Sequence, residues 1–198
     1  MLDHLKRVFA ADPLAGPAAD AATLEIGATV KLVGVVRAVG EPWRAPFTGG
    51  ECVSFIVREG PHWNGRTDGS TGRELLARSQ DFWLECDGGT VLVRPEGWSE
   101  YSLSVTEARS DDETAYARFV AFSERYGMEH RETLSAFTNE MVMLEETLAV
   151  GARVAVHGAV GPRAERPAPR AGYRSERPLT LVPPPEGKLR VSDRPEHL

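Results

Sequence analysis

Alternating apolar and polar residues dominate the chain and predict a protein built mainly of short β-strands. In residues 29–39, Leu32 and Val36 fall on one face of the predicted strand and Lys31 on the other. Asp87-Gly88-Gly89 is typical of a tight hairpin turn. Further strands are predicted at 52–58, 82–86, 90–94, 101–106, 153–160, 178–182 and 188–192. About seven to nine antiparallel strands of this kind indicate a small barrel or sandwich, a mainly β (α+β) fold.

Two segments have helical rather than strand periodicity. Residues 2–10 place apolar side chains on one face of a short N-terminal helix, which is too short to be stable alone. A second helix is predicted as an insertion at about 110–128. It starts at the capping box Ser110-Asp111-Asp112-Glu113 and stops at Gly127.

These elements predict one folded domain with a short appendage. Residues 1–22 are expected to be the short helix and a linker rich in Ala, Gly and Pro, and 23–195 a single β domain. Within that domain, 59–74 and 161–177 are rich in Gly, Pro and charged residues and are expected to be mobile loops. The strands at 29–39, 52–58, 82–86, 90–94 and 153–160 are expected to share one core.

The net charge of −6 is unevenly distributed along the sequence. Residues 1–151 hold 14 Lys/Arg and 24 Asp/Glu, whereas 152–198 hold 9 and 5. An acidic body is expected to repel nucleic acid and anionic membranes, so no tight nucleic-acid binding is predicted. Because no apolar run approaches about 20 residues, no membrane span is expected, and the protein is predicted to be soluble and cytoplasmic.

Residues that could carry chemistry are few. The two cysteines, Cys52 and Cys86, lack the close-spaced partners of a zinc site, and the five histidines have no ligand spacing. His157 alternates with the valines of its strand and is expected to face solvent. No nucleotide-binding, serine-hydrolase or metalloprotease motif is present. We therefore expect no metal, no cofactor and no catalytic residue, and a protein that is not an enzyme.

Large aromatic and cationic residues in loops are the best candidates for an interaction surface with a protein partner. The apolar face of the N-terminal helix and the Arg-rich loop after the 153–160 strand are further candidates. The predicted surface comprises Trp43, Arg44, His62, Trp63, Leu2, Leu5, Phe9, Arg163, Arg166 and Arg170.

Several short motifs together point to a known domain family. In chain order they are VKLVGVVRAVGEP, the turn Pro46-Phe47-Thr48-Gly49, Cys52-Val53, FWLECDGGTVLVRPEG, the segment from Glu145 to Gly151 that leads into VAVHGAV, and LTLVPPPEGKLRVSD. In order and spacing, over about residues 25–193, they resemble the GIDE domain, also called the BAM ("beside a membrane") domain. That domain lies next to the transmembrane helices of mitochondrial membrane-anchored RING ubiquitin ligases and of many bacterial and archaeal proteins.

The resemblance implies a non-catalytic domain that recognises another protein or a regulatory ligand. Because the chain contains no RING and no predicted membrane span, ligase activity is not implied. The family supplies no catalytic residues to transfer. The expected function is that of a soluble, standalone interaction or regulatory module.

Two other functions stay open from the sequence. Small Greek-key barrels bind oligonucleotides through aromatics and a basic groove, although no strand here interleaves Phe or Tyr with Lys or Arg. An enzyme of unrecognised type is the other alternative, using His62, Cys52 or the 59–74 loop.

Overall fold

A computed structural model describes residues 12–61, 73–95, 99–108, 113–126, 141–165 and 177–198. The chain divides into two compact units, which we call the barrel unit and the sheet unit. The barrel unit comprises residues 1–36, 82–102 and 153–198, and the sheet unit comprises 37–81 and 103–152. The predicted domain at 23–195 therefore contains residues of both units.

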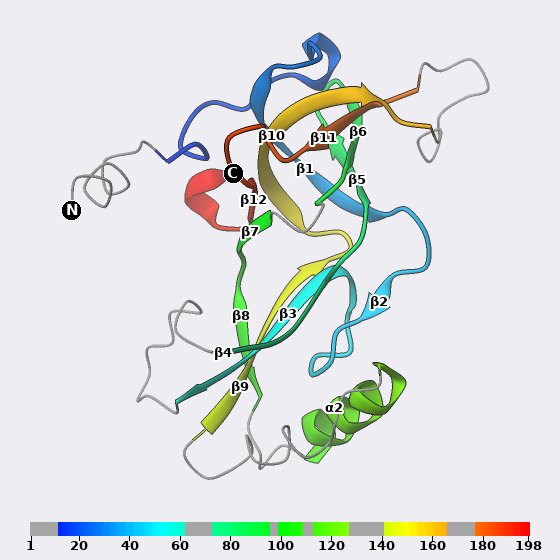
Figure 1. Ribbon diagram of the computed structural model, residues 1–198, viewed down its shortest axis with the longest axis vertical. Helices are drawn as coiled ribbons and strands as arrows, with labels where there is room; N and C mark the ends of the chain where they lie inside the picture. Colours follow the sequence, from blue (N-terminus) through cyan, green and yellow to red (C-terminus); the bar gives the residue numbers. More distant parts are fainter. Residues whose placement is uncertain (1–11, 62–72, 96–98, 109–112, 127–140, 166–176) are drawn as a thin grey trace. The chain divides into compact units, whose positions relative to one another are not determined.

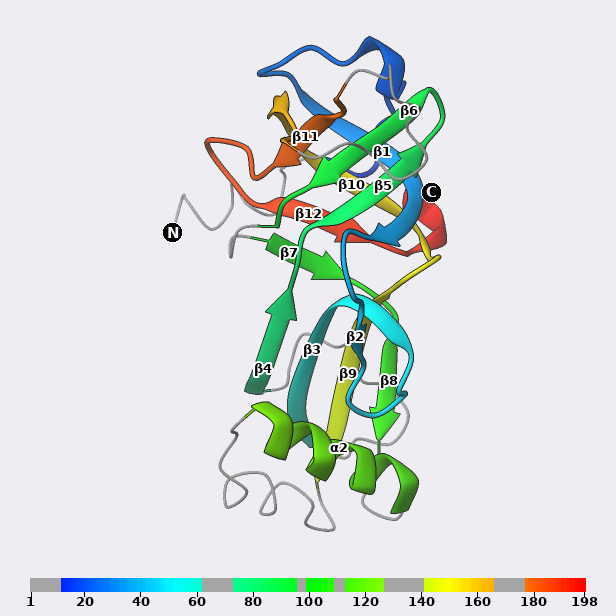
Figure 2. The same cartoon turned by 90° about the vertical axis from the view of Figure 1, so that its right-hand side faces the viewer.

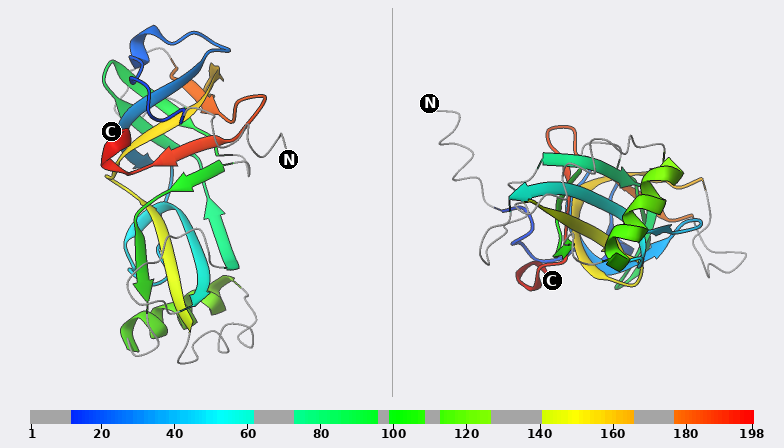
Figure 3. Two further views of the ribbon diagram at one scale, coloured as in Figure 1. Left: turned by 90° about the vertical axis from the view of Figure 1, so that its left-hand side faces the viewer. Right: turned by 90° about the horizontal axis from the view of Figure 1, so that it is seen from below.

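Five strands of the barrel unit close into a ring in which each strand is hydrogen-bonded to two others (Figure 1). Around the ring they are β1 (Thr29–Ala38), β5 (Phe82–Cys86), β6 (Gly89–Val93), β11 (Leu179–Val182) and β10 (Arg153–Arg163), which pairs with β1 again. Two further strands, β12 (Leu189–Ser192) and β7 (Ser99–Ser102), extend the sheet beyond β10 (Figure 3). Short 3-10 turns, η1 (Ala21–Thr23) and η2 (Pro195–His197), precede β1 and follow β12 in the sequence.

The connectivity of the ring is that of a Greek key. Numbered in chain order, its strands follow the spatial order 4-1-2-3, with the fourth strand, β10, beside the first, β1. The fifth strand, β11, closes the ring between β10 and β6, and it runs parallel to β6. The predicted small barrel is thus confirmed as a closed five-stranded barrel with added strands. The prediction that all strands are antiparallel is wrong, because β11 pairs with β6 and β12 pairs with β7 in parallel.

Side chains that alternate along the strands fill the barrel interior. Leu32 and Val36 of β1 and Val154 and Val156 of β10 are fully buried, as the periodicity predicts. The β5–β6 hairpin is also confirmed, and Gly88 at its turn has φ +82°, a conformation that glycine adopts without strain.

The sheet unit is built around one central strand, β3 (Glu51–Pro61) (Figure 2). One edge of β3 pairs with β2 (Trp43–Arg44) and then with β4 (Arg73–Ser79). The other edge pairs with β9 (Met141–Ala149), which pairs in turn with β8 (Val105–Ala108). A 14-residue helix, α2 (Glu113–Tyr126), lies between β8 and β9 in the sequence.

The structure corrects several expectations for this unit. The strand at 52–58 was expected to share one core with the barrel strands, but it forms the centre of the separate sheet unit. The 59–74 segment was expected to be a loop, yet β3 extends to Pro61 and β4 begins at Arg73. Twelve strands are present in the described residues, more than the seven to nine predicted.

Other predictions fall partly or wholly outside the described residues. The short helix predicted at 2–10 lies outside them, as do both predicted ends of the insertion at 110–128, in which α2 lies. The segment 161–177 is described only at its ends, where β10 extends to Arg163. In the described part of the chain, no helix has the length and apolar character needed to cross a membrane.

Candidate functional site

The hairpin that joins β2 to β3, residues 43–51, is closed by its own backbone hydrogen bonds. The amide of Ala45 donates to the carbonyl of Gly50 at 2.9 Å, and the amide of Gly49 donates to the carbonyl of Ala45 at 3.0 Å. Gly49 has φ +68°, which favours glycine at this position. Because Phe47 points inward and is buried while Thr48 is exposed, the tip has an apolar inner side and a polar outer side.

A fully buried carboxylate of β9 forms hydrogen bonds with this turn. Glu145 accepts hydrogen bonds from the amide of Phe47 at 2.6 Å, the amide of Thr48 at 3.3 Å and the Thr48 hydroxyl at 2.8 Å. A buried carboxylate is tolerated when hydrogen-bond donors replace the water that it has lost. The turn supplies three such donors, so Glu145 and the 43–51 hairpin stabilise one another.

A cation from α2 holds the same two residues of the turn by their carbonyl groups. The Arg118 guanidinium donates to the carbonyl oxygens of Phe47, at 3.2 Å, and Thr48, at 3.1 Å. A side chain at Gly49 would come within 3.3 Å of this guanidinium, so glycine also keeps room for Arg118. The turn is therefore fixed through its N–H groups by one side chain and through its C=O groups by another.

Two further groups near Glu145 are structural in character. Cys52 on β3 is buried, and burial, together with the Glu145 carboxylate, raises the pKa of its thiol to about 12. Such a thiol is not ionised at neutral pH, which opposes the nucleophilic role that the enzyme alternative gave to Cys52. Glu146, also buried, forms an ion pair with Arg58 of the adjacent strand.

The predicted interaction residues are only partly brought together. Trp43 is half-buried and packs edge-on against Phe55, with ring centroids 5.7 Å apart. Arg44 beside it is exposed and pairs with Glu51 at 3.2 Å. Arg163 belongs to the barrel unit, where its guanidinium donates to the carbonyl of Arg177 at 2.7 Å. The remaining seven, Leu2, Leu5, Phe9, His62, Trp63, Arg166 and Arg170, lie outside the described residues.

Sequence reasoning missed Glu145, Thr48 and Arg118 as members of one cluster. A signal was available for two of them, because Thr48 lies in the Pro-x-Thr-Gly motif and Glu145 begins the Glu-x-x-Leu-x-x-Gly motif of the stated resemblance. No sequence signal links Arg118 to the turn.

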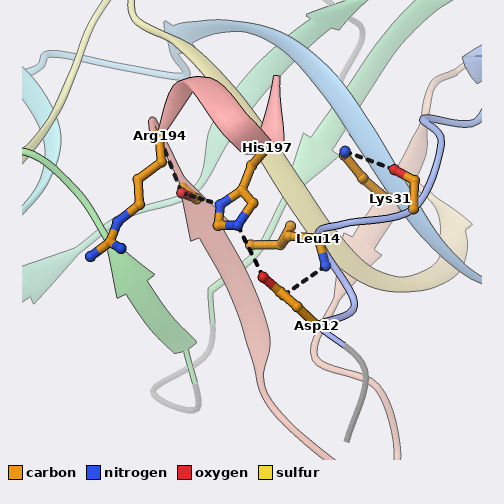
Figure 4. A network of polar contacts seen from close by, with 7 residues as sticks. Asp12, Leu14, Lys31, Arg194 and His197 are labelled. Atoms are coloured by element: carbon orange, nitrogen blue, oxygen red, sulfur yellow. Dashed lines mark hydrogen bonds and ion pairs between the residues drawn. The ribbon is translucent and has the colours of Figure 1, made fainter.

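A second polar cluster lies in the barrel unit and joins the two ends of its sequence (Figure 4). His197 of η2 bonds through Nδ1 to the Ser192 hydroxyl at 2.7 Å and through Nε2 to the Asp12 carboxylate at 3.0 Å. Because a carboxylate accepts hydrogen bonds and cannot donate them, His197 Nε2 carries a proton and donates a hydrogen bond to Asp12.

The Ser–His–Asp set resembles a hydrolase triad in residue types but not in access. Ser192 is fully buried and also accepts the amide of Arg194 at 3.2 Å, so its hydroxyl does not face a substrate. The pKa of Asp12 is lowered, chiefly because the Leu14 amide donates to its carboxylate, with His197 and Arg190 adding to the effect against burial. The cluster fastens two segments of the barrel unit together.

Comparison of the chain with family models, curated proteins and solved structures gives no match. Within the described part of the chain, no three His, Cys, Asp or Glu side chains are grouped as metal ligands.

Proposed function

We propose that this protein is a non-catalytic protein-recognition module of the GIDE/BAM type and that the 43–51 hairpin forms its recognition surface. The observation that carries the proposal is the contact between two motifs of the resemblance. One motif contains the turn Pro46-Phe47-Thr48-Gly49, and the other begins at Glu145. Thr48 and Glu145 are 97 residues apart in the sequence, yet they belong to one hydrogen-bond network. Two of the six motifs of the resemblance therefore hold a single turn.

A turn that is fixed before binding is well suited to recognition. Its partner does not have to order it, so little conformational entropy is lost on association. Binding residues are often found on loops held by a rigid scaffold, and arginine is enriched in protein interfaces. Here the scaffold is β3 and β9, and Arg44 and Thr48 lie on the exposed side of the turn.

The charge of the sheet unit favours a partner with a basic rim. Of the chain's ionisable residues, this unit holds 10 Lys/Arg and 16 Asp/Glu, so the whole net charge of −6 resides in it. Complementary charges around an interface speed association and disfavour wrong partners.

Site-specific photocrosslinking in the native cell tests the proposal. A photoreactive amino acid replaces Gly50, which is exposed at the turn, and in a control protein it replaces Gly40, which is also exposed and has open space around it. We expect a protein partner crosslinked from position 50 and not from position 40. Arg44→Glu in the position-50 protein should reduce that crosslink.

Identical crosslinks from positions 50 and 40 would contradict a surface centred on the turn. So would a position-50 crosslink unaffected by Arg44→Glu, provided that circular dichroism shows both proteins folded.

An oligonucleotide-binding barrel is the second candidate, favoured by the Greek-key ring and by its charge. The barrel unit holds 13 Lys/Arg and 13 Asp/Glu, so it is neutral rather than acidic. Barrels of this type bind strands on the face of their second and third strands, here β5 and β6. On these strands Trp83 and Leu92 are register partners and both are buried, which opposes base stacking on this face.

Fluorescence anisotropy with a labelled single-stranded oligonucleotide separates the two candidates. We expect no sub-micromolar binding at about 150 mM salt, where weak electrostatic contacts are largely screened. Sub-micromolar binding under these conditions would favour the barrel function over protein recognition.

A further inference from the structure

A row of basic residues crosses the outer face of the barrel unit. Lys31 on β1 is the register partner of His157 on β10, and His157 is the register partner of Arg190 on β12. Residues opposite one another on adjacent strands lie about 5 Å apart and point to the same side. Because Leu32 and Val156 point into the barrel, the basic row points outward.

An N-terminal strap, residues 12–19, lies over this face. The Lys31 ammonium group donates to the carbonyl of Gly16 at 2.8 Å, and the amide of Ala19 donates to the carbonyl of Lys31 at 2.8 Å. Ala155 and Ser192 are outward-facing register partners next to the basic row, yet both are fully buried. The strap and η2 account for this burial, because His197 bonds both Ser192 and Asp12.

Two side chains of the strap make the contacts that a ligand would make. The Asp12 carboxylate pairs with His197, and its pKa is lowered in part by the charges of His197 and Arg190. Leu14, two residues later, is almost completely buried. The strap thus presents an acidic group and an aliphatic group in an Asp-x-Leu arrangement (Figure 4).

The basic row is not fully matched by the strap. His157 Nδ1 is buried and has no hydrogen-bond partner among the described residues. Arg190 forms an ion pair with Glu100 of β7, not with the strap, at 3.6 Å, and both of these side chains are exposed. A ligand that forms a hydrogen bond with His157 Nδ1 would make a contact that the strap does not make.

We propose that the face formed by Lys31, His157, Arg190 and His197 is a binding site for an acidic segment of a partner protein, with the strap as its internal competitor. The partner segment carries Asp or Glu followed two residues later by an aliphatic side chain. We infer this chemistry from the strap, which already occupies the face and carries Asp12 followed two residues later by Leu14. Binding displaces residues 12–19 and places the partner's carboxylate against His197 and Arg190.

Peptide binding to the full chain tests the proposal. The probe is a fluorescently labelled peptide with the sequence of residues 12–19, DPLAGPAA, and its matched control carries Asn in place of Asp. In the protein, Asp12→Asn with Leu14→Ala weakens the internal strap. We expect the probe to bind this variant about tenfold more tightly than the unaltered protein, because a competitor has been removed.

Four controls make the result specific to the face. The Asn peptide should not bind, and Arg190→Gln added to the variant should abolish binding. Arg94→Gln, an exposed arginine that follows β6 on another wall of the ring, should leave binding unchanged. Raised salt should weaken binding, since an exposed ion pair is screened.

Absence of probe binding to the folded variant would overturn the proposal, as would equal binding to the variant and the unaltered protein. If the double variant fails to fold, Asp12→Asn alone is used with the same expectations. A dimer of the unaltered protein that the probe dissociates would show that a second copy, through its own strap, is the occupant, and would also overturn it.

Discussion

The Glu145 carboxylate accepts a hydrogen bond from the Thr48 hydroxyl at 2.8 Å, although the two residues are 97 positions apart in the sequence. Glu145 is fully buried, and the other hydrogen bonds that it accepts also come from the 43–51 hairpin. The conformation of that exposed hairpin therefore depends on a residue that no partner could touch.

Replacing this carboxylate should destabilise the sheet unit. Glu145→Gln keeps the shape but replaces one carboxylate oxygen by an NH2 donor, which then faces either the amide of Phe47 or the amide and hydroxyl of Thr48, so we expect a loss of about 2–3 kcal/mol. Hydrogen exchange of backbone amides in the sheet unit under native conditions measures the effect. Thr48→Ser, which keeps the hydroxyl, should lose less than Thr48→Val, and equal losses would contradict the role given to this hydrogen bond.

The packing of the sheet unit depends on Phe55. This side chain is fully buried on the central strand β3, and Trp43 packs against its ring. Phe55→Ala should lower the free energy of unfolding by about 3–5 kcal/mol, as measured in urea. As a control, Ile26→Ala, at a position that is 65% exposed, should change it by less than about 0.5 kcal/mol. Similar losses for the two variants would contradict the assignment of Phe55 to the core.

Stability should fall as the pH drops below 6.5, in part because of His157. Burial and the charge of Arg190 lower the pKa of His157, against an opposite effect of Asp12. The unfolded chain therefore binds a proton near pH 6.5 that the folded protein takes up only at lower pH. This contribution is complete above pH 6.5 and is lost as the pH falls. Urea unfolding of His157→Asn should show a shallower decline than the unaltered protein between pH 6.5 and about 5, and an unchanged slope would refute this.

The two cysteines should be inert in the native protein. Burial raises the pKa of each thiol to about 12, with a further contribution from Glu145 at Cys52 and from Asp87 at Cys86. At pH 8 about one thiol in ten thousand is ionised, and the thiolate is the reactive form. Mass spectrometry after iodoacetamide treatment should find both thiols unmodified until urea unfolds the protein. Rapid alkylation of Cys52 in the folded protein would contradict its burial.

The strands of the barrel could be predicted from the sequence because each shows one face to the interior. Leu32, Val36, Val154 and Val156 alternate with polar or small residues, and their burial follows directly from that period. The Gly-rich turn at 87–89 likewise acts locally, so the β5–β6 hairpin was predictable.

The sheet unit was harder to predict because its stabilising partners are far apart in the sequence. β9 carries Glu145 and Glu146 in its middle, which obscures a strand pattern, and both are buried only because Thr48 and Arg58 are present to bond them. Residues from Cys52 to Val57 on β3 are all buried, whereas alternation assumes one exposed face.

The candidate sites were also hard to predict, because their residues are far apart in the sequence. His157 was expected to face solvent because of its position in the alternating pattern, but it is half-buried. The strap starting at Asp12 and the C-terminal turn with His197 meet next to it across 185 residues of sequence. The charge of residues 1–151 also does not describe one folded unit. The two units alternate along the chain, so this segment contains parts of both.

The pairing of β1 with β10 has a consequence for synthesis on the ribosome. Leu32 must wait for its register partner Val156, so the barrel cannot close until most of the chain has been made. The last strand of the sheet unit, β9, ends at Ala149, before β10 begins at Arg153. The sheet unit can thus fold first, while β1 is not yet paired with β10. Long-range closure of this kind slows folding, and it leaves the apolar face of β1 exposed for longer than that of any other strand of the ring.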